Sequence, residues 1–219
     1  MKKLLCITIL SLCALIASAR AELYKVSFDN FKEGSPVEGL QSVSGQWEIR
    51  KALNPNKTAN LFLSLVDDAS LHATKTAPLF SIALLQKFPQ FSAGIFYARL
   101  RLLGNSKNLN AGLVIRYQDP SDFMYVGFSH AEKKVALYHV RGRQVEKLIE
   151  SQAGIEPGKW LGLRIFLRQA RIKVEIDGQV ALQFSDLSLK RAGGLGFCAF
   201  QQTRADFDNI IVAPLPDQK

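Results

Sequence analysis

Cationic and aromatic side chains that could hold a sugar alternate with apolar residues in segment 95–103. Tyr97, Arg99 and Arg101 occupy every second position there, so a strand would place all three on one polar face. Tyrosine can stack on a sugar ring, and arginine can bind a carboxylate or sulfate through two parallel hydrogen bonds. This set of residues predicts a site for an acidic sugar.

Three further residues are candidates for the same site, provided that neighbouring strands bring their faces together: Arg116, His139 and Arg164. Strand register is not visible in a single sequence, so two interpretations stay open. In one, these residues form a basic groove edged by Tyr97. In the other, they lie on a solvated outer face, with Arg116 buried against an acidic partner.

The residues of the common catalytic and metal sites are not arranged for those roles. His72, His130 and His139 show no metal-ligand spacing, and none is near Cys198 in the sequence. A zinc site or a Cys–His nucleophile therefore has no support. Cys198 lies in the apolar run Gly-Phe-Cys-Ala-Phe and is expected to be buried as a small hydrophobic residue.

The elements that must position these side chains are predicted to be short strands. Segment 111–140 contains three runs rich in β-branched and aromatic residues, separated by turn residues, which is typical of consecutive antiparallel strands. Asp119 and Asp122 flank Pro120 in the first turn and are expected to cap local backbone donors there. The pair Asp177-Gly178 is the strongest hairpin signal in the chain.

Two other segments carry expectations that a structure can test. Segment 42–50, with Trp47 as an apolar anchor, is expected to form one strand, and segment 82–88 a helical turn. Roughly a dozen strands with turns every 8–12 residues and almost no helical periodicity predict an all-β sandwich or barrel.

Residues 1–21 have the pattern of a secretory signal peptide. Lys2 and Lys3 precede an apolar run, and Ala19-Arg20-Ala21 fits a cleavage site before Glu22, with Ala17-Ser18-Ala19 as a competing site. Cleavage there would lower the formal net charge from +9 to +6. Residues 22–219 are then expected to form a single domain with no transmembrane anchor, located outside the cell or in the periplasm.

The moderate positive charge favours acidic partners only weakly. Nucleic acid is not expected as a partner, because the chain carries no RNA- or DNA-binding motif and is predicted to be secreted.

Several motifs together resemble the concanavalin A-like, or laminin-G-like, jelly-roll superfamily: Phe-Asp-Asn-Phe, Gly-Gln-Trp-Glu-Ile, Gly-Lys-Trp-Leu-Gly-Leu-Arg, Ile-Asp-Gly and Phe-Asp-Asn-Ile-Ile-Val. The chain is most similar to the secreted bacterial domains grouped with the keto-disaccharide hydrolase domain. The resemblance spans segment 24–212 and implies a jelly-roll β-sandwich of two antiparallel sheets. The superfamily includes lectins, glucanases, lyases and structural modules, so the fold does not decide the function.

In the resembled folds the terminal strands often pair, with a structural calcium ion nearby. Asp29 and Asp208 each follow a Phe and precede an Asn near the two ends of the domain. Together with backbone carbonyls they could supply part of the six to eight oxygens that calcium needs. The alternative is that both aspartates cap strand ends and turns.

The segment Val174-Glu175-Ile176-Asp177 resembles the catalytic Glu-Ile-Asp of jelly-roll β-glucanases. Those enzymes need a second carboxylate across the bond to be cut, and here Gly178 and Gln179 follow. Asp177 is also expected to point to water at the tip of a hairpin. No catalytic residue is therefore assigned.

The sequence as a whole predicts a secreted, lectin-like module that binds carbohydrate or polysaccharide without cutting it and favours acidic glycans. Two alternatives stay open. One is a glycoside hydrolase or polysaccharide lyase of the keto-disaccharide hydrolase type, and the other is a structural module that binds a protein partner.

Overall fold

A computed structural model describes residues 22–53, 59–67, 80–104, 109–200 and 203–215. The predicted signal peptide, 1–21, lies outside the described residues, as does His72. Within this part of the chain, no helix is long and apolar enough to cross a membrane.

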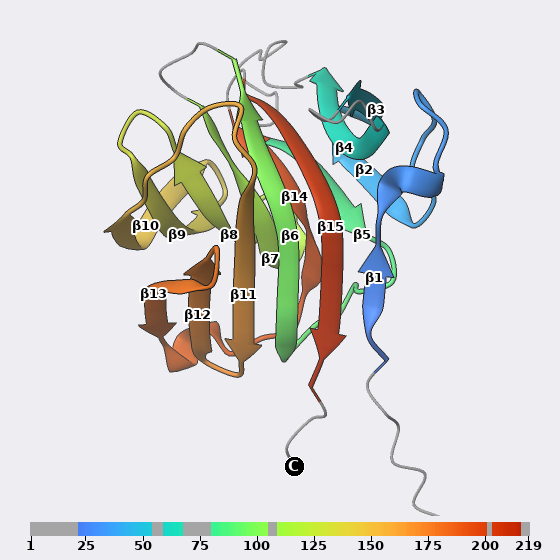
Figure 1. The fold of residues 1–219 in the computed structure, drawn as a ribbon. Helices are drawn as coiled ribbons and strands as arrows, with labels where there is room; N and C mark the ends of the chain where they lie inside the picture. The colour runs from blue at the N-terminus through green and yellow to red at the C-terminus, as the bar shows by residue number, and fades with distance from the viewer. Residues whose placement is uncertain (1–21, 54–58, 68–79, 105–108, 201–202, 216–219) are drawn as a thin grey trace, which may run out of the picture.

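The described residues form two antiparallel sheets that pack face to face (Figure 1). Sheet A consists of β1 (Tyr24–Val26), β3 (Gln46–Leu53), β4 (Ala59–Asp67), β6 (Gly94–Leu103), β11 (Leu161–Arg168), β12 (Arg171–Ile176), β13 (Gln179–Ser185) and β15 (Arg204–Pro214). Sheet B consists of β2 (Leu40–Ser44), β5 (Phe80–Leu85), β7 (Asn110–Asp119), β8 (Asp122–Ser129), β9 (Lys134–Arg141), β10 (Gln144–Gln152) and β14 (Gly194–Phe200). The all-β jelly-roll prediction is confirmed.

The order of strands in sheet A is β13-β12-β11-β6-β15-β4-β3, with β1 paired to β15. The order in sheet B is β10-β9-β8-β7-β14-β5-β2. Strands β7 to β10 are consecutive neighbours, as the pattern of segment 111–140 predicts for its three strands. The first and last strands lie side by side, with Tyr24 opposite Val212.

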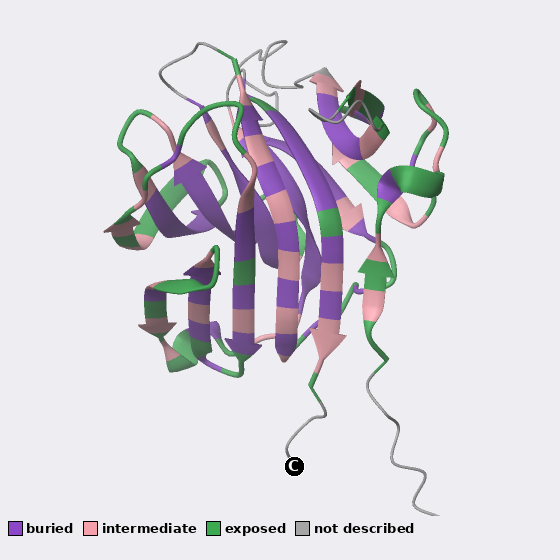
Figure 2. Ribbon diagram, viewed as in Figure 1, coloured by how far each residue is buried: buried purple, intermediate pink, exposed green. Residues whose placement is uncertain are grey.

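The core between the sheets follows from the alternation of apolar residues along each strand. On β6, Phe96, Ala98 and Leu100 are fully buried and face sheet B, so the residues between them face outward. Figure 2 shows this alternation of buried and less buried positions along β6 and β11. We call the side of sheet A that points away from sheet B its outer face.

The hairpin prediction at Asp177-Gly178 is confirmed, because both residues have positive φ angles (47° and 85°) between β12 and β13. The expected helical turn at 82–88 is wrong, since Phe80–Leu85 is a strand, β5. All of its residues except Ser81 are apolar, and such an almost continuous run does not distinguish a strand from a helix.

The prediction of a single strand at 42–50 is also wrong, because this segment contributes to two strands in different sheets. The chain leaves sheet B after Ser44 and enters sheet A at Gln46. Gly45 makes this crossing with a φ of 77°, and a Cβ atom there would lie 2.7 Å from the Cβ atom of Ser81. Both the backbone angle and the lack of space therefore require glycine at this position.

Candidate functional site

Four of the predicted ligand-binding residues lie together on the outer face of sheet A. Tyr97, Arg99 and Arg101 follow one another at alternate positions of β6. Arg164 of β11 is directly opposite Tyr97 in the register. The alternation that located these residues in the sequence therefore brings them together in space.

Arg101 is held by the protein itself. Its Nε and Nη2 atoms donate hydrogen bonds of 3.0 and 2.5 Å to Oδ2 of Asp206, which is fully buried. The guanidinium also lies over the rings of Phe62 and Trp160, at 4.9 and 4.7 Å from their centroids. Burial raises the pKa of Asp206, while Arg101 opposes that shift. This pair is therefore engaged in the structure rather than offered to a ligand.

Arg99 has similar surroundings. Its guanidinium lies 5.2 Å from the centroid of Trp160, and its cross-strand neighbour is Asp208. Arg99 and Arg101 on the outer face thus already have aromatic and acidic neighbours.

Arg164 lies in a second group of contacts lower on the same face. It donates to Oε2 of Glu175 at 3.3 Å, and its guanidinium lies 5.5 Å from the centroid of Tyr97. Lys173 donates to Oε1 of Glu175 at 2.8 Å and lies 3.8 Å from the centroid of Phe166. One carboxylate therefore holds two cations, and each cation covers an aromatic ring.

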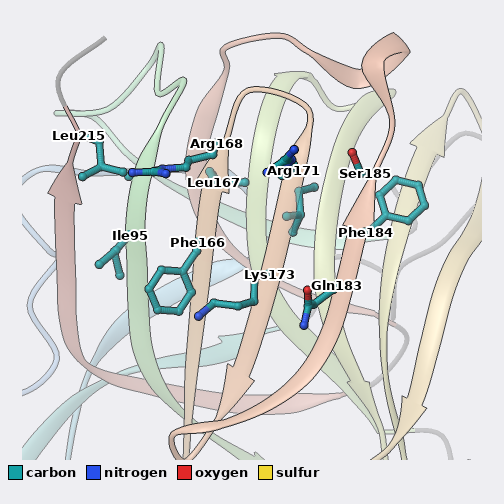
Figure 3. Close-up of a pocket in the computed structure, with 12 residues that line it drawn as sticks. Ile95, Phe166, Leu167, Arg168, Arg171, Lys173, Gln183, Phe184, Ser185 and Leu215 are labelled. Carbon is teal, nitrogen blue, oxygen red and sulfur yellow. The ribbon is translucent and has the colours of Figure 1, made fainter. Parts of the chain in front are cut away.

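A cleft opens on this face next to Phe166 and Lys173, at the end of β11 where Arg168 lies (Figure 3). Its volume is about 670 Å³. The apolar lining includes Ile95, Phe166, Phe184 and Leu215, and the cations are Arg168, Arg171 and Lys173. None of the twelve described residues that line the cleft is an Asp or Glu.

The cations of the cleft differ in their surroundings. Arg168 and Arg171 are exposed, and neither forms an ion pair with an acidic residue of the described chain. Figure 3 shows the end of Lys173 directed toward the ring of Phe166, while Arg168 extends toward Leu215. The cleft therefore offers two cationic groups that have no acidic partner, above an apolar floor.

Arg116 lies away from this face, so the predicted groove does not include it. Its side chain is 1% exposed, and its Nη2 atom donates to the backbone carbonyl of Gln169 in the β11–β12 turn. Burial, followed by the charge of Arg191, lowers its pKa to about 10. Arg116 is therefore buried, as one of the two interpretations expected. Among the described residues, however, its hydrogen-bond partner is a backbone carbonyl and not an acidic side chain.

His139 also lies elsewhere, in a polar cluster between β8, β9 and the segment before β14. Its Nε2 atom is 3.2 Å from Oδ1 of Asp122. Arg191 donates to both carboxylate oxygens of Asp122, at 2.6 and 2.5 Å. Arg191 is the main reason that the pKa of Asp122 falls to about 2. The three side chains line a second pocket of about 380 Å³.

The turn that precedes β8 confirms one capping prediction and corrects the other. Asp119 accepts a hydrogen bond of 2.7 Å from the backbone N–H of Ser121, as expected. Asp122 was expected to cap the same turn, but its carboxylate binds Arg191 and His139 instead. Partners that are distant in the sequence cannot be read from turn composition.

The outer side of sheet B carries a buried aromatic cluster. Phe80 of β5 lies 5.2 Å from Tyr125 of β8, measured between ring centroids, although β14 and β7 separate these strands. In a flat sheet the two strands would be about 14 Å apart, so sheet B must curve toward this side. Cys198, 1% exposed, is part of this cluster, and its predicted burial is confirmed.

Comparison with known proteins identifies the family. Residues 28–213 match the 3-keto-alpha-glucoside-1,2-lyase-like domain. The chain belongs to this family. A comparison with curated protein sequences returned no match.

Solved structures share the fold of this family member at low sequence identity. The carbohydrate-binding module CBM66 from Bacillus subtilis has a TM-score of 0.61 at 15% identity, covering 78% of this chain and 93% of the module. The β-glucanase of Bacillus licheniformis has a TM-score of 0.59 at 9% identity, with coverages of 88% and 98%. The alginate lyase AlgAT5, of polysaccharide lyase family 7, has a TM-score of 0.51 at 13% identity, with coverages of 76% and 82%.

The Glu-Ile-Asp segment of this family member does not supply two free carboxylates. Glu175 is 9% exposed and is held by Arg164 and Lys173. Asp177 is exposed at the hairpin tip, as expected. Its Oδ1 atom also accepts a 2.7 Å hydrogen bond from the backbone N–H of Gly162 on the neighbouring strand β11.

Asp29 and Asp208 lie close enough for Asp29 to raise the pKa of Asp208, although burial is the larger cause. Asp208 accepts from the backbone N–H of Asn209 at 2.7 Å, and Asp29 accepts from the Ser27 hydroxyl at 2.5 Å. The contact of Asp208 is the expected capping of a backbone donor, whereas that of Asp29 joins two side chains. No group of three or more His, Cys, Asp or Glu side chains suited to a metal occurs among the described residues. Calcium binding stays a prediction that these two carboxylates alone would support.

Proposed function

We propose that this domain binds carbohydrate in the cleft on the outer face of sheet A and favours acidic sugars over neutral ones. Membership of the 3-keto-alpha-glucoside-1,2-lyase-like family supports carbohydrate as the ligand class. Pockets of roughly 300–1,000 Å³ hold small ligands, and the cleft, at about 670 Å³, is within that range.

The observation that carries the proposal is the lining of the cleft. Apolar side chains can pack against the C–H face of a sugar, while Arg168, Arg171 and Lys173 can bind its carboxylate. None of the described lining residues is acidic, so an anionic ligand would meet no repulsion from the cleft itself.

The test is a titration with trigalacturonate and with neutral galactotriose at low and high salt. We expect tighter binding of trigalacturonate and a loss of that advantage at high salt, because exposed charges are screened. Replacing Arg171 by Gln should weaken binding of the acidic sugar about fivefold, the effect of one partly exposed ion pair.

The matched control is Lys51→Gln, which removes one positive charge from an exposed position on β3. It should leave the affinity unchanged. Equal binding of both sugars, or equal effects of the two substitutions, would contradict the proposed site. Binding without new reducing or unsaturated ends supports a lectin-like role.

A second candidate is an enzyme, favoured by the family and by the Asp122–His139 pair in the second pocket. In a 3-keto glucoside the ketone acidifies the proton on C2. A base could remove that proton as the substituent on C1 leaves with its bonding electrons, which forms a C1–C2 double bond. Incubation with a 3-keto glucoside, followed by product analysis for wild type and His139→Gln, tests this candidate.

The third possibility, a module that binds a protein partner, gains support if no sugar is bound or cleaved.

A further inference from the structure

Glu175 lies beside the cleft without lining it. It forms ion pairs with two cations near the site, Arg164 and Lys173. We propose that Glu175 is an internal competitor for the carboxylate of the ligand, so that only an anionic sugar readily frees Lys173 and uncovers the aromatic ring of Phe166. This inference rests on the proposed function of the cleft. It adds a residue that sets how readily Lys173 leaves Phe166 for a ligand.

The contacts of Glu175 resemble those that a bound carboxylate would make. Its two oxygens accept separately from Lys173 and Arg164, at 2.8 and 3.3 Å. The side chain is only 12% exposed, so it is less screened by water than a surface carboxylate. Hydrogen bonding from Lys173 is the main reason that its pKa is lowered, which indicates that the group is ionised in the folded protein.

The register explains why this carboxylate affects the cleft. Glu175 faces Arg164 across β12 and β11, and the next pair on the same face is Lys173 with Phe166. The amine of Lys173 lies 3.8 Å from the centroid of Phe166. A sugar that stacks on Phe166 must therefore displace Lys173 from the ring.

The charges then distinguish between ligands. A neutral sugar that moves Lys173 separates an ion pair and provides no replacement, which leaves Glu175 without its closest partner. An acidic sugar exchanges one carboxylate partner of Lys173 for another. Arg168 and Arg171, which have no acidic partner in the described chain, would attract such a ligand to the cleft.

The direct test is Glu175→Gln, which keeps the shape of the side chain and removes its charge. We expect trigalacturonate to bind about fivefold more tightly, because Lys173 no longer has to leave an ion pair. Hydroxyl-radical footprinting of the sugar-free variant should show greater oxidation of Phe166 and Tyr97. Unchanged or weaker binding, together with unchanged oxidation, would overturn the inference.

Glu156→Gln is the matched control. Glu156 also pairs with a lysine, Lys159, at 2.6 Å, and both are exposed before the start of β11, at the end opposite the cleft. This variant makes the same change in net charge and should leave the affinity and the footprint unchanged. A rise in affinity equal to that of Glu175→Gln would show a general charge effect and would overturn the inference.

A measurement on the wild type does not depend on the stability of a variant. NMR titration of the Glu175 carboxyl carbon, without and with saturating trigalacturonate, should show a higher pKa in the complex, because Lys173 has changed its partner. An unchanged titration in a protein that binds the sugar would refute the competitor role and leave the proposed function intact. If Arg171→Gln and the wild type bind trigalacturonate equally, the proposed site itself fails.

Discussion

At the scale of single residues, the arginines of the outer face divide into those held by the protein and those offered to solvent. Arg101 belongs to the first kind, because it neutralises Asp206, whose side chain is 0% exposed. Arg171 belongs to the second, because it is exposed and has no acidic partner among the described residues. Residue type alone does not separate these roles, since both alternate along amphipathic strands.

Replacing Arg101 by Ala should therefore destabilise the fold rather than affect a ligand. It leaves the buried Asp206 without its ion-pair partner, for which we expect a loss of about 3 kcal/mol in the free energy of unfolding, measured in urea. Arg50→Ala is the control, since Arg50 is 48% exposed where it pairs with Glu48, and its loss should cost less than about 0.5 kcal/mol. Similar effects of both substitutions would show that the buried pair contributes little.

At the scale of elements, the alternation of apolar and polar residues was sufficient to locate the outer face of sheet A. Tyr97, Arg99 and Arg101 could be assigned to one face of one strand from the sequence, and Arg164 joined them because β11 pairs with β6. The cleft was not predicted. Its cations come from β11 and β12 and its apolar residues also from β6 and β13, and their alignment depends on the register between strands.

Arg116 shows why the rest of the site could not be predicted. Its φ angle is 53°, and the register of β7 against β8 shifts between Ile115 and Asp119. Such an irregularity redirects a side chain relative to its neighbours. Alternation counted from the sequence therefore assigns the wrong position after this point, and no turn residue between Ile115 and Gln118 signals the change.

The Asp122 cluster connects three separate parts of the fold and should make stability depend on pH. The pKa of Asp122 is lowered to about 2, from an ordinary value of 3.8. A carboxyl with a lowered pKa stabilises the folded state above its unfolded pKa, and this contribution is lost as the pH falls through the folded value.

We therefore expect Asp122→Asn to lower the free energy of unfolding by about 1 kcal/mol at neutral pH, since the side chain is partly exposed. The difference from wild type should shrink between pH 4 and 2. The measurement is the melting temperature across that range, with Asp186→Asn as the control, because Asp186 accepts its hydrogen bonds from Ser188 within its own turn and forms no ion pair among the described residues. A difference that is constant with pH would contradict the ion-pair explanation.

At the scale of the whole molecule, the two ends of the chain are joined by the pairing of β1 with β15. Asp29 follows β1, and Asp208 lies on β15, so a cation between them would stabilise this junction. Burial raises the pKa of Asp208, and the charge of Asp29 adds to this shift while Arg99 opposes it.

If calcium binds there, a chelator should lower the melting temperature of the wild type, because an ion that binds only the folded state stabilises it. Asp208→Ala should abolish that difference, while Asp186→Ala should preserve it. A melting curve that responds neither to chelator nor to added calcium would leave the two aspartates only their hydrogen bonds.

The pairing of the terminal strands also has a practical consequence for handling this domain. β15 ends at Pro214 beside Gly94, and the next residue, Leu215, lines the cleft. Because Tyr24 pairs with Val212, the start of β1 and the end of β15 lie at the same end of the sandwich (Figure 1). A fluorophore or a sensor-chip linkage attached at Leu215 would crowd the cleft that this residue lines. The exposed Gly154, in the loop before β11 and at the opposite end of that strand, is the better attachment point for immobilising the protein.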